Sequence, residues 1–244
     1  MQSLAQKTII ERLQKQILDL EGYKSEAQQE QSKLDFALIE KHFPNQVFPT
    51  GTIHEFVSER PEHTACTSAF IFALLSKLHS NKGIYVWIGK QRQLFAASLV
   101  FYGIHPHQII FINLVKQKDI LWATEEALKC KSLSAVISEL EDITFAQSQR
   151  LQLTVEKSKV TGFILRTQAE RINATACAAR WQITPTASAN QENLPGVGFA
   201  RWKVELLKVR NGSTASCTLT YQHRKFSTEQ AAKTYPFTHQ AISS

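Results

Sequence analysis

The sequence has no closely spaced pair of cysteines. Its four cysteines, at positions 66, 130, 177 and 217, stand far apart, so no Cys-x-x-Cys motif is available for a zinc knuckle or a dithiol redox centre. We expect each of them to behave as a small buried apolar residue in a reducing cytoplasm.

Long hydrophobic runs are also absent. The longest apolar stretches, such as 69–75, are far too short to span a bilayer, and the N-terminus has no apolar core of a signal peptide. We therefore expect a cytoplasmic protein with no membrane partner. Of the 244 residues, 43% are hydrophobic and 20% are charged, as in an ordinary globular chain. The formal net charge of +7 favours polyanions such as DNA or RNA as partners.

The chain divides into three regions by composition. Residues 1–35 combine an amphipathic helix over 4–21, with apolar side chains at helical spacing, and a polar linker. Residues 36–222 form the folded core. Residues 223–244, rich in His, Lys, Thr, Gln and Ser, are expected to form a flexible tail.

Strand and helix patterns alternate through most of the core. We predict strands over 52–57, 84–88, 108–114, 133–138 and 161–166, and helices over 64–79, 93–101, 118–130 and 144–157. This alternation predicts right-handed βαβ units, that is, an α/β fold with a mainly parallel sheet and helices on both faces. Three further strands, over 178–184, 202–210 and 215–222, surround an Asn211-Gly212 turn and predict an antiparallel C-terminal extension.

Residues 58–65 join the first predicted strand to a helix, which is where a nucleotide-binding protein carries its phosphate loop. Such a loop needs two glycines, a Lys on the phosphates and a Ser or Thr on Mg²⁺. In frame, Ser58 and His63 take the glycine positions, Thr64 takes the Lys position and Ala65 takes the Ser/Thr position. All four residues are lost, so we expect a degenerate loop and no nucleotide cofactor.

Two other polar groupings are weaker. Glu139, Glu141 and Asp142 follow a predicted strand, but acidic residues are common where a helix begins. His105-Pro-His107 lacks further ligands at an informative spacing. We expect neither a metal site nor a catalytic residue.

The tripeptide Ala-Arg-Trp at 179–181 recurs at 200–202, each time opening a predicted strand. Interleaved basic and aromatic residues can hold a nucleic-acid backbone and stack on its bases. On this basis we interpret Arg180, Arg201, Lys203 and Arg210 as contacts to DNA or to a partner protein. In the alternative interpretation, both tryptophans pack in the core and the arginines lie at strand ends.

Five segments together resemble the ImuA family. They are FPNQVFPTGTIHEF, IIFINLVKQKDILWATEEALKC, RLQLTVEKSKVTGFILR, TACAARWQITP and PGVGFARWKVELLKVRNG. This family consists of RecA-like accessory proteins of bacterial error-prone (translesion) DNA repair, and the resemblance is to its Bacteroidota type in particular. It covers roughly residues 4–212. SulA-type cell-division inhibitors share a more distant version of the core.

The resemblance implies a RecA-like (P-loop NTPase-type) core and a role in the SOS response to DNA damage. The implied partners are ImuB, an inactive Y-family polymerase-like subunit, and through it an error-prone replicative-type polymerase. RecA and DNA are further implied partners. The protein would act in the cytoplasm and join the nucleoid after damage.

The same resemblance places the Mg²⁺-binding strand end at Ser138 and Glu139, where the Asp is missing, and the RecA catalytic glutamate near Gln91. Together with the lost phosphate loop, these departures predict a non-catalytic scaffold that recruits polymerase subunits to damaged DNA. Two alternatives stay open. One is a SulA-like inhibitor that binds the division GTPase, and the other is a RecA-type ATPase with residual nucleotide binding.

Overall fold

The computed structural model describes residues 37–78, 83–90, 96–167, 172–188 and 198–228, together with Ile9, Arg12 and Leu13. These three isolated residues are helical and exposed. The remainder of the predicted N-terminal helix and its linker lies outside the described residues.

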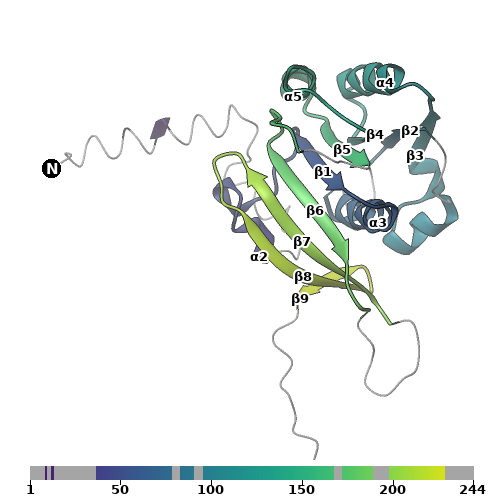
Figure 1. The fold of residues 1–244 in the computed structure, drawn as a ribbon. Helices are drawn as coiled ribbons and strands as arrows, with labels where there is room; N and C mark the ends of the chain where they lie inside the picture. Colours follow the sequence, from purple (N-terminus) through teal and green to yellow (C-terminus); the bar gives the residue numbers. More distant parts are fainter. Residues whose placement is uncertain are drawn as a thin grey trace, which may run out of the picture.

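A single sheet of nine strands organises the described residues (Figure 1), in the order β3-β2-β4-β5-β1-β6-β7-β8-β9. Strands β1 to β6 run parallel to one another, whereas β7, β8 and β9 are antiparallel. The strands are β1 (Ile53–Ser58), β2 (Tyr85–Gly89), β3 (Ile109–Asn113), β4 (Ala135–Leu140), β5 (Thr161–Thr167), β6 (Ala179–Pro185), β7 (Ala200–Val209), β8 (Ala215–Gln222) and β9 (Lys225–Thr228). The predicted α/β class, the mainly parallel sheet and the antiparallel C-terminal extension are confirmed.

Helices cover both faces of the parallel part of the sheet (Figure 1). α3 (Pro61–Leu78) lies on one face, over a core that contains Phe56, Trp87 and Trp181. α4 (Gln117–Lys129) and α5 (Phe145–Ser158) lie on the other, over a second core. The short elements are α2 (Ala37–Glu40) and three 3-10 helices, η2 (Pro44–Gln46), η3 (Ala96–Tyr102) and η4 (Pro106–Gln108).

Burial explains why the strands have different sequence patterns. Every residue of β1 and β2 is buried, because each strand has packing on both faces, and this removes the alternation of polar and apolar residues. In β7 only one face is covered, so Trp202, Val204 and Leu206 are buried while Lys203 and Leu207 are exposed. The alternation of polar and apolar residues therefore returns in β7, beyond the part of the sheet that helices cover on both faces.

Local signals explain two of the helix ends. Thr144 caps α5: its hydroxyl accepts a hydrogen bond from the Gln147 amide at 3.3 Å, and the Gln147 side chain accepts one from the Thr144 amide at 2.9 Å. The predicted start of α3 is wrong: the helix begins at Pro61 rather than at Thr64. Proline suits the first turn of a helix, where its missing N–H costs nothing. In the described part of the predicted helix over 93–101, the chain forms η3.

The sheet continues into the segment that was expected to be a tail. β9 pairs with β8 through a tight turn at His223 and Arg224, which have φ of 50° and 59°. A two-residue hairpin turn of this kind is usually signalled by Asn or Gly at both positions. Neither is present here, so no turn signal in the sequence indicates the last hairpin. Residues 229–244 lie outside the described residues.

Two further expectations concern the membrane and the cysteines. Among the described residues, none of the helices combines the length and the apolar character that crossing a membrane requires. Cys66 and Cys177 are buried as expected, and burial raises the pKa of each thiol to about 12. The expectation is wrong for Cys130, which is exposed because it directly follows the end of α4.

Candidate functional site

The connection between β1 and α3 holds only two residues, Glu59 and Arg60. A phosphate loop wraps several backbone N–H groups around the anion, which needs a longer glycine-bearing turn. Here α3 starts at once, and the Thr64 amide donates to the Arg60 carbonyl at 3.1 Å as part of the helix. The loop itself is therefore missing, in addition to its four defining residues.

The residues that stand at those four positions have other environments. Ser58 is the last residue of β1, fully buried, and its hydroxyl lies 3.3 Å from that of Thr67. His63, Thr64 and Ala65 lie in the first turns of α3, where His63 and Thr64 are half-buried and Ala65 is exposed. Ser58 is therefore part of the core, whereas Ala65 faces solvent.

Ser138 and Glu139, which stand where a Mg²⁺-binding Asp is expected, make contacts within the protein. β4 runs to Leu140, two residues beyond its predicted end, so Ser138 and Glu139 lie inside the strand. The Ser138 hydroxyl lies 2.6 Å from that of Thr124, and Glu139 Oε1 accepts a hydrogen bond from Trp87 Nε1 at 2.8 Å. Burial raises the pKa of the Glu139 carboxyl, and the Trp87 contact opposes this rise. Gln91 lies outside the described residues.

No metal centre can be assembled from the part of the chain that is described. Nowhere in it do three His, Cys, Asp or Glu side chains gather in a way that could hold an ion. His105 and His107 stack on each other with ring centroids 5.5 Å apart. Glu141 pairs with Lys90, and Asp142 pairs with Arg166.

Instead of a nucleotide site, a buried ion-pair network lies beside the centre of the sheet. Its centre is Glu55 of β1, whose side chain is completely buried. Glu55 Oε1 accepts a hydrogen bond from Arg166 at 3.3 Å, and Oε2 accepts bonds from Arg180 Nε at 2.8 Å and from the Thr175 hydroxyl at 2.6 Å. One carboxylate thus compensates two nearly buried guanidinium groups.

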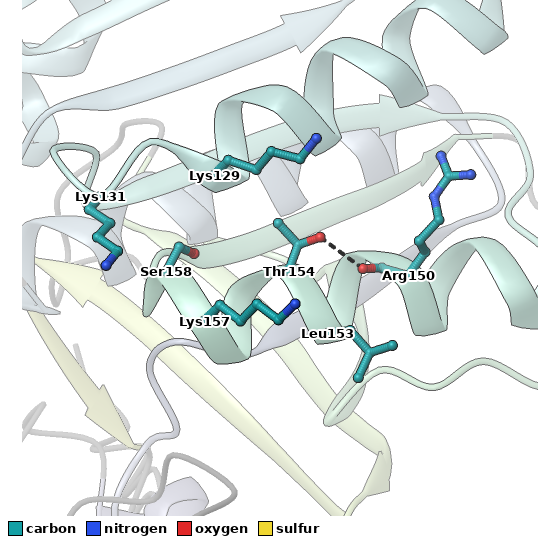
Figure 2. A pocket seen from close by; sticks show the side chains of 7 residues that line it. All are labelled: Lys129, Lys131, Arg150, Leu153, Thr154, Lys157 and Ser158. Atoms are coloured by element: carbon teal, nitrogen blue, oxygen red, sulfur yellow. Dashed lines mark hydrogen bonds between the residues drawn. The ribbon is translucent and has the colours of Figure 1, made fainter.

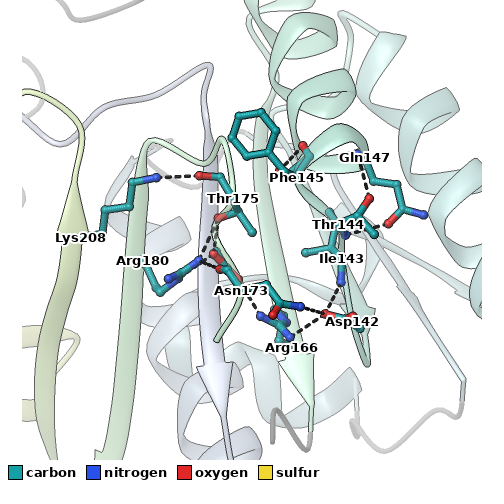
Figure 3. Close-up of polar contacts among 12 residues, drawn as sticks. Asp142, Ile143, Thr144, Phe145, Gln147, Arg166, Asn173, Thr175, Arg180 and Lys208 are labelled. Carbon is teal, nitrogen blue, oxygen red and sulfur yellow. Dashed lines mark hydrogen bonds and ion pairs between the residues drawn. The ribbon is translucent and has the colours of Figure 1, made fainter. Parts of the chain in front are cut away.

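The network also fixes the segment 172–178 that leads into β6. Figure 3 shows Arg180 and Lys208 directed at this segment and Arg166 directed at Asp142. Arg180 donates to the Asn173 carbonyl at 2.5 Å, Lys208 donates to the Thr175 carbonyl at 2.6 Å, and Arg166 bonds Asp142 at 2.7 Å. These contacts hold the antiparallel extension against the parallel sheet.

The four residues interpreted as contacts to DNA or a partner do not form one patch. Arg180 is nearly buried in the network, and Arg210 donates to the Ala176 carbonyl at 2.5 Å. Arg201 is half-buried, and Lys203 is exposed beside Glu205, with its ammonium 2.8 Å from that carboxylate. Contact of these residues with DNA or a partner stays a prediction, and the structure shows intramolecular contacts for Arg180 and Arg210.

The two tryptophans of the repeated tripeptide belong to the core. Trp181 is fully buried and Trp202 is 3% exposed, so the alternative interpretation of these residues is confirmed. Trp181 also donates a hydrogen bond to His54 Nδ1 at 3.3 Å, while His54 Nε2 lies 2.8 Å from the Pro49 carbonyl. A donor faces one ring nitrogen and an acceptor faces the other, so the neutral ring with its proton on Nε2 satisfies both contacts.

His54 gives the fold a dependence on pH. Desolvation by burial lowers its pKa from 6.5 to about 4. Between these values the unfolded chain binds a proton that the folded chain excludes, so stability falls as the pH falls. We expect acidification from pH 7 to pH 5 to cost about 2 kcal/mol through this residue.

Urea unfolding of the wild-type chain and of His54→Gln at both pH values would measure this effect. The other titrating groups are common to the two proteins, so the difference between them isolates His54. Equal losses of stability on acidification in both proteins would show that the histidine is not responsible.

A basic cavity that sequence reasoning missed lies between the C-terminal ends of α4 and α5. It has a volume of about 460 Å³. Figure 2 shows Lys129 and Lys131 at the end of α4 opposite Arg150 and Lys157 on α5. The remaining lining residues are Leu153, Thr154 and Ser158. Arg150 and Lys157 are seven residues apart, which places them on one face of a helix and indicates a basic face in the sequence. The spacing alone does not identify the helix that lies beside this face.

Comparison with known proteins finds similarity both in sequence and in structure. No protein-family model matches the chain. In two strains of Caulobacter vibrioides, Protein ImuA is 28% identical to it over 196 residues, which cover 75% of this chain and 80% of the relative. Among solved structures, the crystal structure of SulA from Pseudomonas aeruginosa matches with a TM-score of 0.40 and 16% identity, over 47% of this chain and 97% of that one. This similarity to Protein ImuA supports the resemblance to the ImuA family that the sequence segments indicate.

Proposed function

We propose that this protein is a non-catalytic accessory protein of damage-induced, error-prone translesion DNA synthesis. In this proposal it is a scaffold that recruits polymerase subunits to damaged DNA. The similarity to Protein ImuA supports the pathway. The observation that supports a scaffold over an ATPase is the two-residue connection between β1 and α3.

This connection matters because of where it lies in the fold. In open α/β sheets, ligands bind at the carboxyl ends of the strands, where the strand order changes direction. β1 is central in the sheet, with β5 and β6 on its two sides, and its carboxyl end leads directly into α3. An α/β sheet with a two-residue connection after its central strand supports the proposal of a RecA-like scaffold that holds no triphosphate there.

The partners in the proposal are those that the family resemblance implies. An ImuB-type Y-family-like subunit would bind directly, and an error-prone replicative-type polymerase would bind through it. RecA and DNA would be further contacts at the damaged nucleoid. The amphipathic pattern over 4–21 is a docking element in this scheme, because one face of it is apolar.

Co-expression with the ImuB-type subunit tests both the scaffold role and the absence of ATP chemistry. We expect the two proteins to purify together in equal yield with and without Mg²⁺·ATP, because the connection after β1 holds only two residues and is too short for a phosphate loop. The division GTPase serves as the comparison bait in the same experiment. Capture of that GTPase without the polymerase-like subunit would support the SulA-like alternative. Capture that requires ATP would support a residual ATPase.

A further inference from the structure

The basic cavity between α4 and α5 lies away from every feature used above. Both helices precede the next strand of the sheet, so their C-terminal ends lie at the edge opposite to the β1–α3 connection. The cavity draws its charges from Lys129, Lys131, Arg150 and Lys157. Four cations from two helices and one connecting turn thus surround one concave site.

Two of these cations are already partly compensated. Lys129 Nζ lies 2.6 Å from Glu126 Oε1, and Arg150 pairs with Glu125. Four cations against two carboxylates leave two positive charges. The C-terminal ends of the two helices each contribute about half a negative charge, which reduces the excess without cancelling it.

Lys131 and Lys157 supply the excess charge. Both are exposed, and among the residues that the structure describes neither has an ion pair or a hydrogen bond from its ammonium group. The guanidinium group of Arg150, which is the group best suited to bind a carboxylate, already pairs with Glu125. Lysine ammonium groups bind phosphate as point charges, so the two free lysines suit a phosphate ligand.

An exposed aromatic residue extends this surface. Trp122 is 64% exposed, whereas Trp87, Trp181 and Trp202 are at most 3% exposed. It precedes Lys129 by seven residues, two helical turns, and therefore lies on the same side of α4. Basic groups next to an exposed aromatic ring are the combination by which single-stranded nucleic acid is held without sequence preference.

We propose that the basic cavity binds the phosphate backbone of single-stranded nucleic acid, with Trp122 as a surface for base stacking. This inference does not depend on the proposed scaffold function, because the cavity and the β1–α3 connection lie at opposite edges of the sheet. It also differs from the sequence-based interpretation, which placed such contacts on β6 and β7.

Fluorescence anisotropy of a labelled oligothymidylate with the full chain tests the proposal across a range of salt concentrations. The test variant is Lys131→Glu with Lys157→Glu, and the charge-matched control is Lys41→Glu with Lys225→Glu, two exposed lysines elsewhere. We expect the test variant to bind at least about tenfold more weakly. The slope of log Kobs against log salt should fall by about 1.4, which is about 0.7 for each of two lost contacts to a single strand.

Three comparisons keep the proposal falsifiable. Lys131→Gln with Lys157→Gln should reproduce the loss with a circular dichroism spectrum like that of the wild type, which separates binding from misfolding. Trp122→Ala should weaken binding by roughly fivefold or more. Pyrophosphate should compete far more weakly than unlabelled oligonucleotide, since it lacks the bases.

Several outcomes would overturn the inference. Equal losses in the test variant and the charge-matched control would show a general effect of net charge. A loss confined to Arg201→Ala with Lys203→Ala would place binding on β7. Unchanged affinity in Trp122→Ala would reject a stacked single strand, and equal competition by pyrophosphate would indicate a site for free anions. Tighter binding of an acidic peptide would indicate a protein partner.

Discussion

Replacing Glu55 with alanine is expected to lower the free energy of unfolding by about 3–5 kcal/mol. The carboxylate is fully buried between Arg166, whose side chain is 2% exposed, and Arg180, whose side chain is 11% exposed. Without it, the two guanidinium groups stay inside the protein and lose the fully buried carboxylate that they share, while Asp142, the Thr175 hydroxyl and the Asn173 carbonyl remain among their polar neighbours. The cost arises because Arg180 loses its carboxylate partner and Arg166 keeps Asp142, whose side chain is 59% exposed.

Total stabilities of single domains are about 5–15 kcal/mol, so this variant should lie close to unfolding. Urea unfolding and soluble yield measure the effect. Glu62→Ala is the matched control, because its partner Arg60 is 3.7 Å away and both side chains are more than half exposed. An exposed pair of this kind contributes about 0–1 kcal/mol. Similar costs for the two substitutions would contradict the assignment of Glu55 as the centre of a buried network.

The network also shows why the sequence predicted elements better than sites. Glu55 is separated from Arg166 by 111 residues and from Arg180 by 125. No local pattern links residues so far apart. The pairing follows from the strand order, which places β5 and β6 on either side of β1. Arg180 was therefore interpreted as an external contact, although the fold gives it a buried partner.

β2 could be predicted because burial on both faces leaves a clear signal in the sequence: the run YVWIG marks it to within one residue of its observed ends. The run IIFIN marks β3 equally well, although β3 is an edge strand in which Ile110 is 51% exposed. The turn at Asn211 was also predicted, and its φ of 56° explains why an Asn suits that position. The last hairpin has the same backbone requirement at Arg224 but an unfavourable residue for it, so it was missed.

Both the sequence and the structure are needed to describe the connection between β1 and α3. The sequence showed that Ser58, His63, Thr64 and Ala65 lack phosphate chemistry. It did not show that the loop had been shortened to two residues, because a Pro at position 61 fits a connector as well as a first helical turn. A site that had lost only side chains could still hold an anion on its backbone amides, whereas a missing loop cannot.

Replacing Trp181 with alanine is the second change for which we expect a loss of about 3–5 kcal/mol. The indole is fully buried under α3, stacked on Phe56 with centroids 5.7 Å apart and planes 8° apart. Phe43 and Phe70 pack on it at 5.7 and 6.1 Å. The substitution leaves a cavity at the junction of β1 and β6, where the extension joins the parallel sheet, and it removes the donor that faces His54.

Trp122→Ala provides the matched control for this change, because the same atoms are removed from a side chain that is 64% exposed. A surface substitution of this kind usually changes stability by no more than about 0.5 kcal/mol. Urea unfolding at pH 7 compares the two variants directly, and equal losses would contradict the central role of Trp181. The comparison can be repeated at pH 5. Water that enters the cavity would ease protonation of His54, so Trp181→Ala should lose less stability on acidification than the wild-type chain does.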